Sequence, residues 1–101
     1  MVKVTPWPGT TAPSRADIER TLASEGLSAY SWSNGPGDVY GVHSHTYNKV
    51  IYVVSGSITF TLPDRDEEVL LERGDRLDLP AEVRHGAKVG QAGVTCLEAH
   101  C

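Results

Sequence analysis

The sequence predicts an all-β protein with one short helix near its N-terminus. Three observations support this fold class. Only one segment of the 101 residues repeats its apolar side chains at helical spacing. About eight further segments are short and either apolar or alternating, and clusters of turn-forming residues separate them at intervals of roughly 8–12 residues. Short strands at this spacing are typical of a β-sandwich or a β-barrel.

The N-terminal part, residues 1–27, is predicted to be an extended arm followed by the helix. The arm is rich in proline, threonine and glycine, which favour irregular structure. Ser14 is a favourable helix N-cap. Ile18 and Leu22 then recur at helical spacing before a glycine that ends the pattern. The sequence therefore predicts a helix over residues 15–25.

The rest of the chain, residues 28–101, is predicted to form the β domain. Apolar and polar side chains alternate within residues 57–62, as in a half-buried strand. Ser55-Gly56, directly before that segment, is predicted to be a two-residue hairpin turn. The predicted strands, each bounded by turn-forming residues, are 28–32, 39–45, 49–54, 57–62, 68–71, 76–79, 83–89 and 94–99.

Composition argues against several classes of function. The net charge is −4 and the basic residues are scattered, so we expect no nucleic-acid partner. The longest strongly apolar run, residues 50–54, is far too short to span a membrane, and we expect a cytoplasmic protein. Cys96 and Cys101 lie on or just after the last predicted strand, where a disulfide between them is not expected.

Three histidines are candidate metal ligands. His43 and His45 are two residues apart and so share one face of a strand, while His85 lies within the predicted strand 83–89 and shares its face with Val83, Ala87 and Val89. If these faces point inward, three imidazoles meet and leave coordination positions open for water or substrate. On an exposed face the same pair would be inert. His100, near the C-terminus, is expected to face solvent and is assigned no role.

The spacing of the glycines, the histidines and one proline resembles the two sequence motifs of the cupin family. The first motif is G-x5-H-x-H-x3,4-E-x6-G and the second is G-x5-P-x-G-x2-H-x3-N. The matching residues are Gly37, His43, His45, position 49 and Gly56 for the first motif, and Gly74, Pro80 and His85 for the second.

The resemblance covers residues 28–99. It implies a double-stranded β-helix, that is, a jelly-roll barrel, which is often dimeric and binds one divalent metal at its mouth. In that arrangement Gly56 would permit the hairpin between the two strands that carry the first motif.

The match fails where the family has its fourth ligand, a glutamate. This position is Lys49, and the second motif has Glu82 and Val89 in place of its glycine and asparagine. The last two differences are peripheral. The lysine matters because an ammonium group has no lone pair to donate to a metal.

Four interpretations of Lys49 stay open. The three histidines alone hold a metal, as the resemblance implies for thiol and diketone dioxygenases that use Fe(II), and Lys49 beside them attracts an anionic substrate. Alternatively, the metal is lost and the pocket binds a small anion. In the third, Lys49 is a buried base or Schiff-base amine. In the fourth, it bends away and pairs with a surface carboxylate.

Other side chains are candidates for the pocket wall. Trp32, Tyr40 and Tyr47 are aromatic candidates, although aromatic residues on strands more often serve packing. Alternation along the strand places Tyr52 on the other face from Lys49 and outside the pocket. Glu98, if it points inward, could supply a substitute carboxylate.

The sequence therefore predicts a cupin barrel with a metal site at His43, His45 and His85. The metal is a divalent transition ion, one of Fe, Mn, Ni, Zn or Cu. The leading function is a mononuclear metal-dependent dioxygenase acting on a small anionic molecule, with Lys49 next to the metal or binding the anion. The alternative is a non-catalytic cupin, either a sensor or a protein with a vestigial site. A homodimer is expected from the resemblance.

Overall fold

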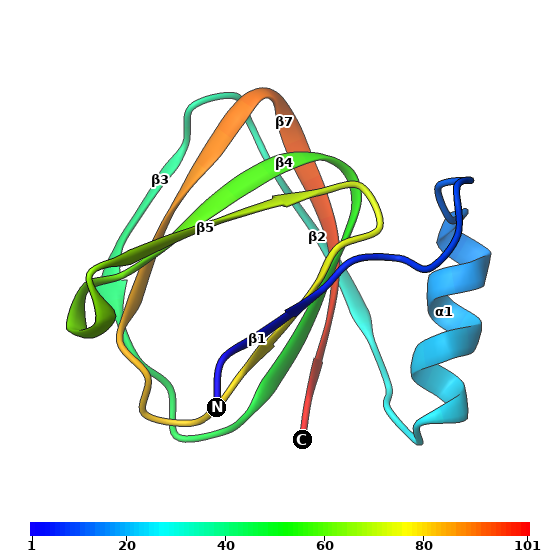
Figure 1. The fold of residues 1–101 in the computed structure, drawn as a ribbon, viewed down its shortest axis with the longest axis horizontal. Helices are drawn as coiled ribbons and strands as arrows, with labels where there is room; N and C mark the ends of the chain where they lie inside the picture. Colours follow the sequence, from blue (N-terminus) through cyan, green and yellow to red (C-terminus); the bar gives the residue numbers. More distant parts are fainter.

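The computed structural model describes all of residues 1–101. It confirms an all-β protein with one short α-helix, in which the strands pair antiparallel. The strands curve around an enclosed interior, and the helix lies outside it (Figure 1). The elements are β1 (Lys3–Thr5), α1 (Arg15–Ser24), β2 (Tyr30–Asn34), β3 (Val39–His43), β4 (Lys49–Leu62), a 3-10 turn (Pro63–Arg65), β5 (Glu67–Glu72), β6 (Arg76–Leu79) and β7 (His85–His100).

Two long strands, β4 and β7, organise the barrel. They pair with each other along most of their length. The other edge of β4 pairs first with β6 and then with β5, while that of β7 pairs first with β3 and then with β2. Because each long strand is shared in this way, one continuous sheet wraps around the larger apolar core. β1 adds a short strand at the edge of β6, which the sequence did not predict.

The predicted hairpin at Ser55-Gly56 is wrong. Residues 49–54 and 57–62 belong to one strand, β4, and the register with β7 shifts on either side of Gly56 instead of breaking. Gly56 has a φ of +77°, and a Cβ there would lie 1.9 Å from the carbonyl oxygen of Gly93. Glycine therefore permits a bulge and a close approach of the two strands, and β4 bends without turning back.

The same correction applies to the last two predicted strands. Residues 85–89 and 94–99 are parts of a single strand, β7, which runs from His85 to His100, and residues 83 and 84 precede it. Local turn signals cannot distinguish a bent strand from two strands joined by a turn. Here β7 pairs with β4 both before and after residues 90–93, and a shift of register takes up these residues.

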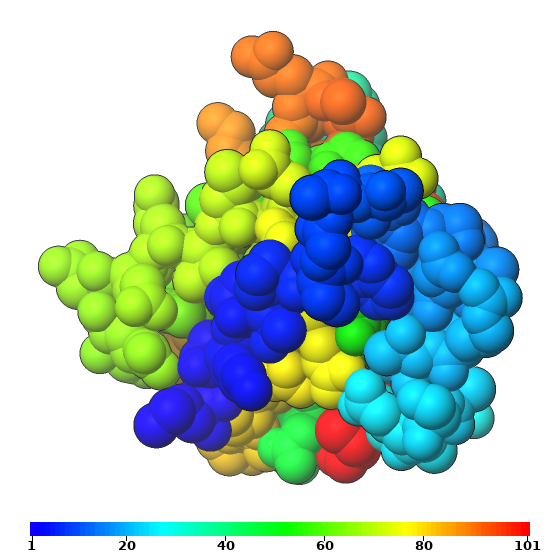
Figure 2. All heavy atoms as spheres, turned by 45° about the vertical axis from the view of Figure 1, so that its right-hand side comes forward, coloured from blue at the N-terminus to red at the C-terminus, as the bar shows by residue number.

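The helix forms close to where it is predicted, and it packs against the outside of the barrel. The Ser14 hydroxyl accepts a hydrogen bond from the Asp17 amide at 3.1 Å, and the Asp17 carboxylate accepts one from the Ser14 amide at 2.9 Å. Ile18 and Leu22 are buried against the outward side chains of β4 and β7, which are Val50, Tyr52 and Leu97. Figure 2 shows the N-terminal arm lying across the sheet beside this helix.

The two faces of β4 serve different cores. Ile51 and Val53 point into the barrel, where they join the larger apolar cluster. Val50 and Tyr52 point outward to α1, so Tyr52 is outside the pocket as predicted. This alternation sends the side chain of Lys49 inward with that of Ile51.

The one helix, α1, is too short and too polar to cross a membrane.

Candidate metal centre

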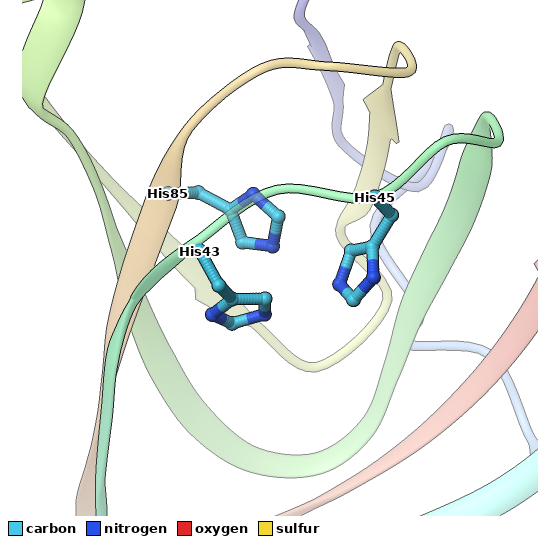
Figure 3. Close-up of side chains that lie close together, drawn as sticks. All are labelled: His43, His45 and His85. Carbon is cyan, nitrogen blue, oxygen red and sulfur yellow. The ribbon is translucent and has the colours of Figure 1, made fainter.

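The three predicted histidines come together at one mouth of the barrel. His43 ends β3 and is paired in register with His85, the first residue of β7, whereas His45 lies in the segment that leads into β4. One ring nitrogen from each residue lies within 4.8 Å of those of the other two. Figure 3 shows the rings projecting into the same space from these different segments. Long-range pairing of β3 with β7 thus creates the cluster.

Backbone carbonyls orient two of the rings. His43 Nδ1 lies 2.7 Å from the carbonyl oxygen of Gly41, and His85 Nδ1 lies 2.9 Å from that of Val83. A ring nitrogen that faces a carbonyl oxygen must carry the proton and donate it. Nε2 of each neutral ring therefore keeps its lone pair for a metal, as in other protein sites with histidine ligands.

His45 provides the test of whether a metal fits. Its Nδ1 lies 3.2 Å from the hydroxyl of Tyr47. Its Nε2 is the only buried side-chain nitrogen or oxygen in the protein without a hydrogen-bond partner. A buried polar atom left unpaired is costly, and such atoms in native proteins commonly serve a ligand or ion. The three nitrogen donors fit a transition metal.

The charge state of the rings also suits metal binding. Burial lowers the pKa of His85 and of His45 below the ordinary value of 6.5, and the nearby positive charge of Lys49 lowers both further. Both rings are therefore neutral near pH 7. Only a neutral imidazole has a lone pair to offer a metal.

Lys49 points into the barrel and pairs with Glu98. The side chains are 10% and 5% exposed, and Nζ lies 3.5 Å from Oε2. The interpretation in which Lys49 bends away to a surface carboxylate is therefore wrong. Inward alternation along β4 places its stem among apolar side chains, and the buried carboxylate on β7 compensates its charge.

Glu98 points inward, but other side chains hold its oxygens. Oε2 accepts hydrogen bonds from the Tyr30 hydroxyl at 2.6 Å and from His100 Nε2 at 2.7 Å, and Oε1 accepts one from Trp32 Nε1 at 3.1 Å. Burial alone would raise the pKa of Glu98, but these hydrogen bonds and the charge of Lys49 outweigh it and lower the pKa. Glu98 is thus an anchored carboxylate, and it does not belong to the histidine cluster.

Sequence reasoning missed two of these partners. Tyr30 was given no role, and burial together with Glu98 raises its pKa, so its hydroxyl stays protonated as a donor. His100 was expected to face solvent; its side chain is 38% exposed, but it bonds to Glu98 and packs against Tyr47. Alternation along β7 places His100 on the same face as Glu98, and that signal could have revealed it.

The histidines and Lys49 line one cavity of about 300 Å³. Its size is at the lower end for small-molecule sites. The aromatic candidates Trp32, Tyr40 and Tyr47 all line it. The full lining is Tyr30, Trp32, Tyr40, His43, His45, Tyr47, Lys49, Ile51, Ile58, Phe60, His85, Ala87 and Glu98.

An antiparallel sheet wrapped into a barrel, with a histidine cluster at its mouth, defines the class of protein as a cupin-type domain. Comparison with family models agrees, because the Cupin domain model matches residues 32–97. The chain therefore belongs to the cupin family. No curated protein matches the sequence.

Solved structures support the same fold. An RmlC-like cupin from Shewanella frigidimarina NCIMB 400 is 27% identical with a TM-score of 0.63, over 73% of this chain and 64% of that one. A structure of the DMSP lyases RdDddP and RnDddQII is 29% identical with a TM-score of 0.64, over 73% of this chain but only 37% of that one. A DUF861 family protein from Thermotoga maritima matches over the full length of both chains at 18% identity and a TM-score of 0.66.

Proposed function

We propose that this cupin binds one divalent transition metal through His43, His45 and His85 and uses it to bind and transform a small molecule. The unpartnered, buried Nε2 of His45 carries the proposal. The carbonyls behind the other two rings support it, because they leave Nε2 as the free atom of each ring.

Charge balance supports an anionic donor group on the ligand. The cavity contains one ammonium and one carboxylate, and these form a pair. The imidazoles of His45 and His85 are neutral. A divalent ion held by neutral imidazoles would therefore keep its charge uncompensated, unlike an ion that also has a glutamate ligand. A carboxylate or enolate group on the ligand would supply the missing negative charge.

The leading reaction type is a dioxygenase that uses Fe(II). A bound metal with open positions would supply Lewis-acid or redox chemistry there. The protein orients the histidines, lines the cavity with apolar and aromatic side chains, and keeps the Lys49–Glu98 pair beside the ligand. A lyase is the second candidate, favoured by the 29% identity to the DMSP lyase structure.

The metal content of the reconstituted protein tests whether the three histidines bind a metal. Protein produced without a histidine tag is reconstituted in turn with Fe(II), Mn(II), Ni(II), Zn(II) and Cu(II), and bound metal is measured by elemental analysis. We expect about one ion per chain, and loss of most of it in His43→Ala and His85→Ala. His100→Gln is the matched control, because it removes a histidine outside the cluster. Failure of every metal to bind would contradict the proposal.

Nitric oxide tests the reaction type. It is a surrogate for O₂ that gives an electron paramagnetic resonance signal on Fe(II) with an open position. We expect the signal in the Fe(II)-loaded protein. Metal binding without this signal would argue against the dioxygenase and favour the lyase or a non-catalytic binding role.

A further inference from the structure

Nearly all polar side-chain atoms of the cavity wall are already paired within the protein. The hydroxyl of Tyr30 and the indole nitrogen of Trp32 donate to Glu98, and the hydroxyl of Tyr40 donates to Asn34. The Tyr47 hydroxyl contacts His45 Nδ1. Because these groups already have hydrogen-bond partners, we expect them to contact a ligand through their ring surfaces and not through new hydrogen bonds.

Lys49 is the exception outside the histidine cluster. It makes no hydrogen bond within the protein, and its one charged contact is Glu98 Oε2 at 3.5 Å. An ammonium group has three N–H donors. The side chain is 10% exposed and lines the same cavity as the histidines. Its N–H donors are therefore free to bind a ligand in the cavity, and they are largely shielded from bulk water.

The character of the group that Lys49 would bind follows from Glu98. The Lys49 charge is balanced by this buried carboxylate, which is 5% exposed and fixed by Tyr30, Trp32 and His100. A second carboxylate at Lys49 would lie beside Glu98 in a region of low polarity, and like charges there repel strongly. An uncharged oxygen acceptor gains the hydrogen bond without that repulsion.

The remaining cavity wall is apolar. Ile51, Ile58, Phe60 and Ala87 present no polar side-chain atom. A charged or hydrogen-bonding group placed against them would lose its water without replacement. The part of a ligand that lies against these side chains is therefore expected to be hydrocarbon.

We propose that the ligand is a small oxo or hydroxy acid, in which a carboxylate binds the metal, a short hydrocarbon linker lies against the apolar wall, and an uncharged carbonyl or hydroxyl oxygen accepts a hydrogen bond from Lys49. The first of these contacts rests on the proposed metal site. The other two rest on Lys49, Glu98 and the apolar wall alone. Departure from the family glutamate at position 49 thus becomes a determinant of specificity.

Matched probes test this assignment by isothermal titration calorimetry on Zn(II)-loaded protein. The oxo acids are 4-oxopentanoate, 5-oxohexanoate and 6-oxoheptanoate. Each is compared with its parent acid (pentanoate, hexanoate or heptanoate) and with the diacid that has its second carboxyl at the same position (succinate, glutarate or adipate). We expect at least one oxo acid to bind about tenfold or more tightly than both of its partners, because a hydrogen bond to a charged group supplies that much discrimination.

Two variants make the test specific. Lys49→Met should bring the oxo acid and its parent to within about threefold of each other. Glu98→Gln should shift the preference toward the diacid, because it leaves the Lys49 charge unbalanced. Lys88→Met, at an exposed lysine, should change neither preference. If Lys49→Met does not fold, the double variant Lys49→Met/Glu98→Gln removes both charges together and should show the same loss.

Zinc content measured on the same samples distinguishes failure of the ligand assignment from failure of the proposed metal site. Full zinc content with a wild-type preference for the diacid or the parent acid overturns this inference alone. The same holds if the oxo-acid preference survives in Lys49→Met. Wild-type protein that binds no zinc and no other metal overturns the proposed function on which the first contact rests.

Discussion

At the scale of single residues, Lys49 and Glu98 decide the charge of the cavity. The family pattern would place a glutamate at position 49, on β4. Here an ammonium occupies that position and a carboxylate lies on the adjacent strand β7, at 3.5 Å. The pair keeps the cavity neutral and leaves the three histidines as the only close cluster of metal-binding side chains. A metal at the histidines would therefore need a negatively charged donor from the ligand, and Lys49 would favour an uncharged oxygen on that ligand.

Lys49→Glu is expected to tighten metal binding. The new carboxylate would face the cavity that contains the histidines and add a negatively charged ligand, and the divalent ion would offset its repulsion from Glu98. We expect the dissociation constant for Zn(II) to fall by about tenfold or more. Lys49→Gln is the control, since it removes the ammonium without adding a carboxylate. Equal zinc affinity in Lys49→Glu and Lys49→Gln would show that position 49 does not reach the metal.

Glu98 is expected to make the protein's stability depend on acid pH. Its pKa is lowered in the folded protein from 4.5, so the folded state binds fewer protons than the unfolded state. This stability is present above pH 4.5 and is lost as the pH falls through the lower, folded pKa. Urea unfolding of metal-free protein between about pH 6 and pH 3 measures it.

The comparison variant for this pH dependence is Glu98→Gln, because glutamine has no carboxyl group to titrate. Its unfolding free energy should fall less steeply with decreasing pH than that of the wild type. Glu68→Gln, at an exposed glutamate with no ion pair, should follow the wild-type slope. Parallel curves for wild type and Glu98→Gln would contradict the prediction.

At the scale of elements, the two bent strands position the site. β4 delivers Lys49 and Ile51 to the cavity, and β7 delivers His85 and Glu98. Both strands must stay paired while they curve around the core, and the register shifts beside Gly56 take up the curvature. A straight pair of strands of this length would not close into a barrel.

Gly56→Ala is therefore expected to destabilise the protein by about 3 kcal/mol or more. Alanine disfavours the observed φ of +77°, and its Cβ would lie 1.9 Å from the Gly93 carbonyl oxygen. Denaturant unfolding measures the loss. Gly41→Ala is the control, because a Cβ there meets nothing within 4 Å. A similar small change in both variants would contradict this account of the bend.

At the scale of the whole molecule, the protein has two apolar cores on opposite faces of the same strands. The larger one fills the barrel and supports the cavity, and the smaller one lies between the barrel and α1. Arg76 strengthens the second by binding Glu25 at the end of the helix and Asp78 on β6. Since the histidines lie on the barrel side, the helix should contribute to stability without shaping the site.

Ile18→Ala tests this separation of roles. Ile18 is fully buried under the helix, so its truncation should cost about 2–5 kcal/mol in unfolding free energy. Folded Ile18→Ala should still bind one metal ion with wild-type affinity. Glu19→Ala, at an exposed position on the same helix, should cost far less. Loss of metal binding in a folded Ile18→Ala variant would show that the helix does shape the site.

Much of the site could be predicted from the chain because its signals are local. The two-residue spacing indicates that His43 and His45 lie together, although His45 lies beyond the end of β3, and alternation along β4 separates Tyr52 from Lys49. The Ser14 cap and the spacing of Ile18 and Leu22 likewise define the helix within one residue of its observed end. These features depend on backbone geometry that neighbouring residues share, so a short window of sequence contains them.

Only the tertiary structure decided the rest. The sequence by itself determined an all-β chain with one capped helix and three histidines at cupin spacing, since periodicity and turn residues are local properties. It did not determine that Gly56 lies in a bulge rather than a hairpin, nor that Lys49 is neutralised by Glu98 and Glu98 anchored by Tyr30 and His100. Those contacts join residues up to 68 positions apart, and they exist only because β7 pairs with β2, β3 and β4 at once.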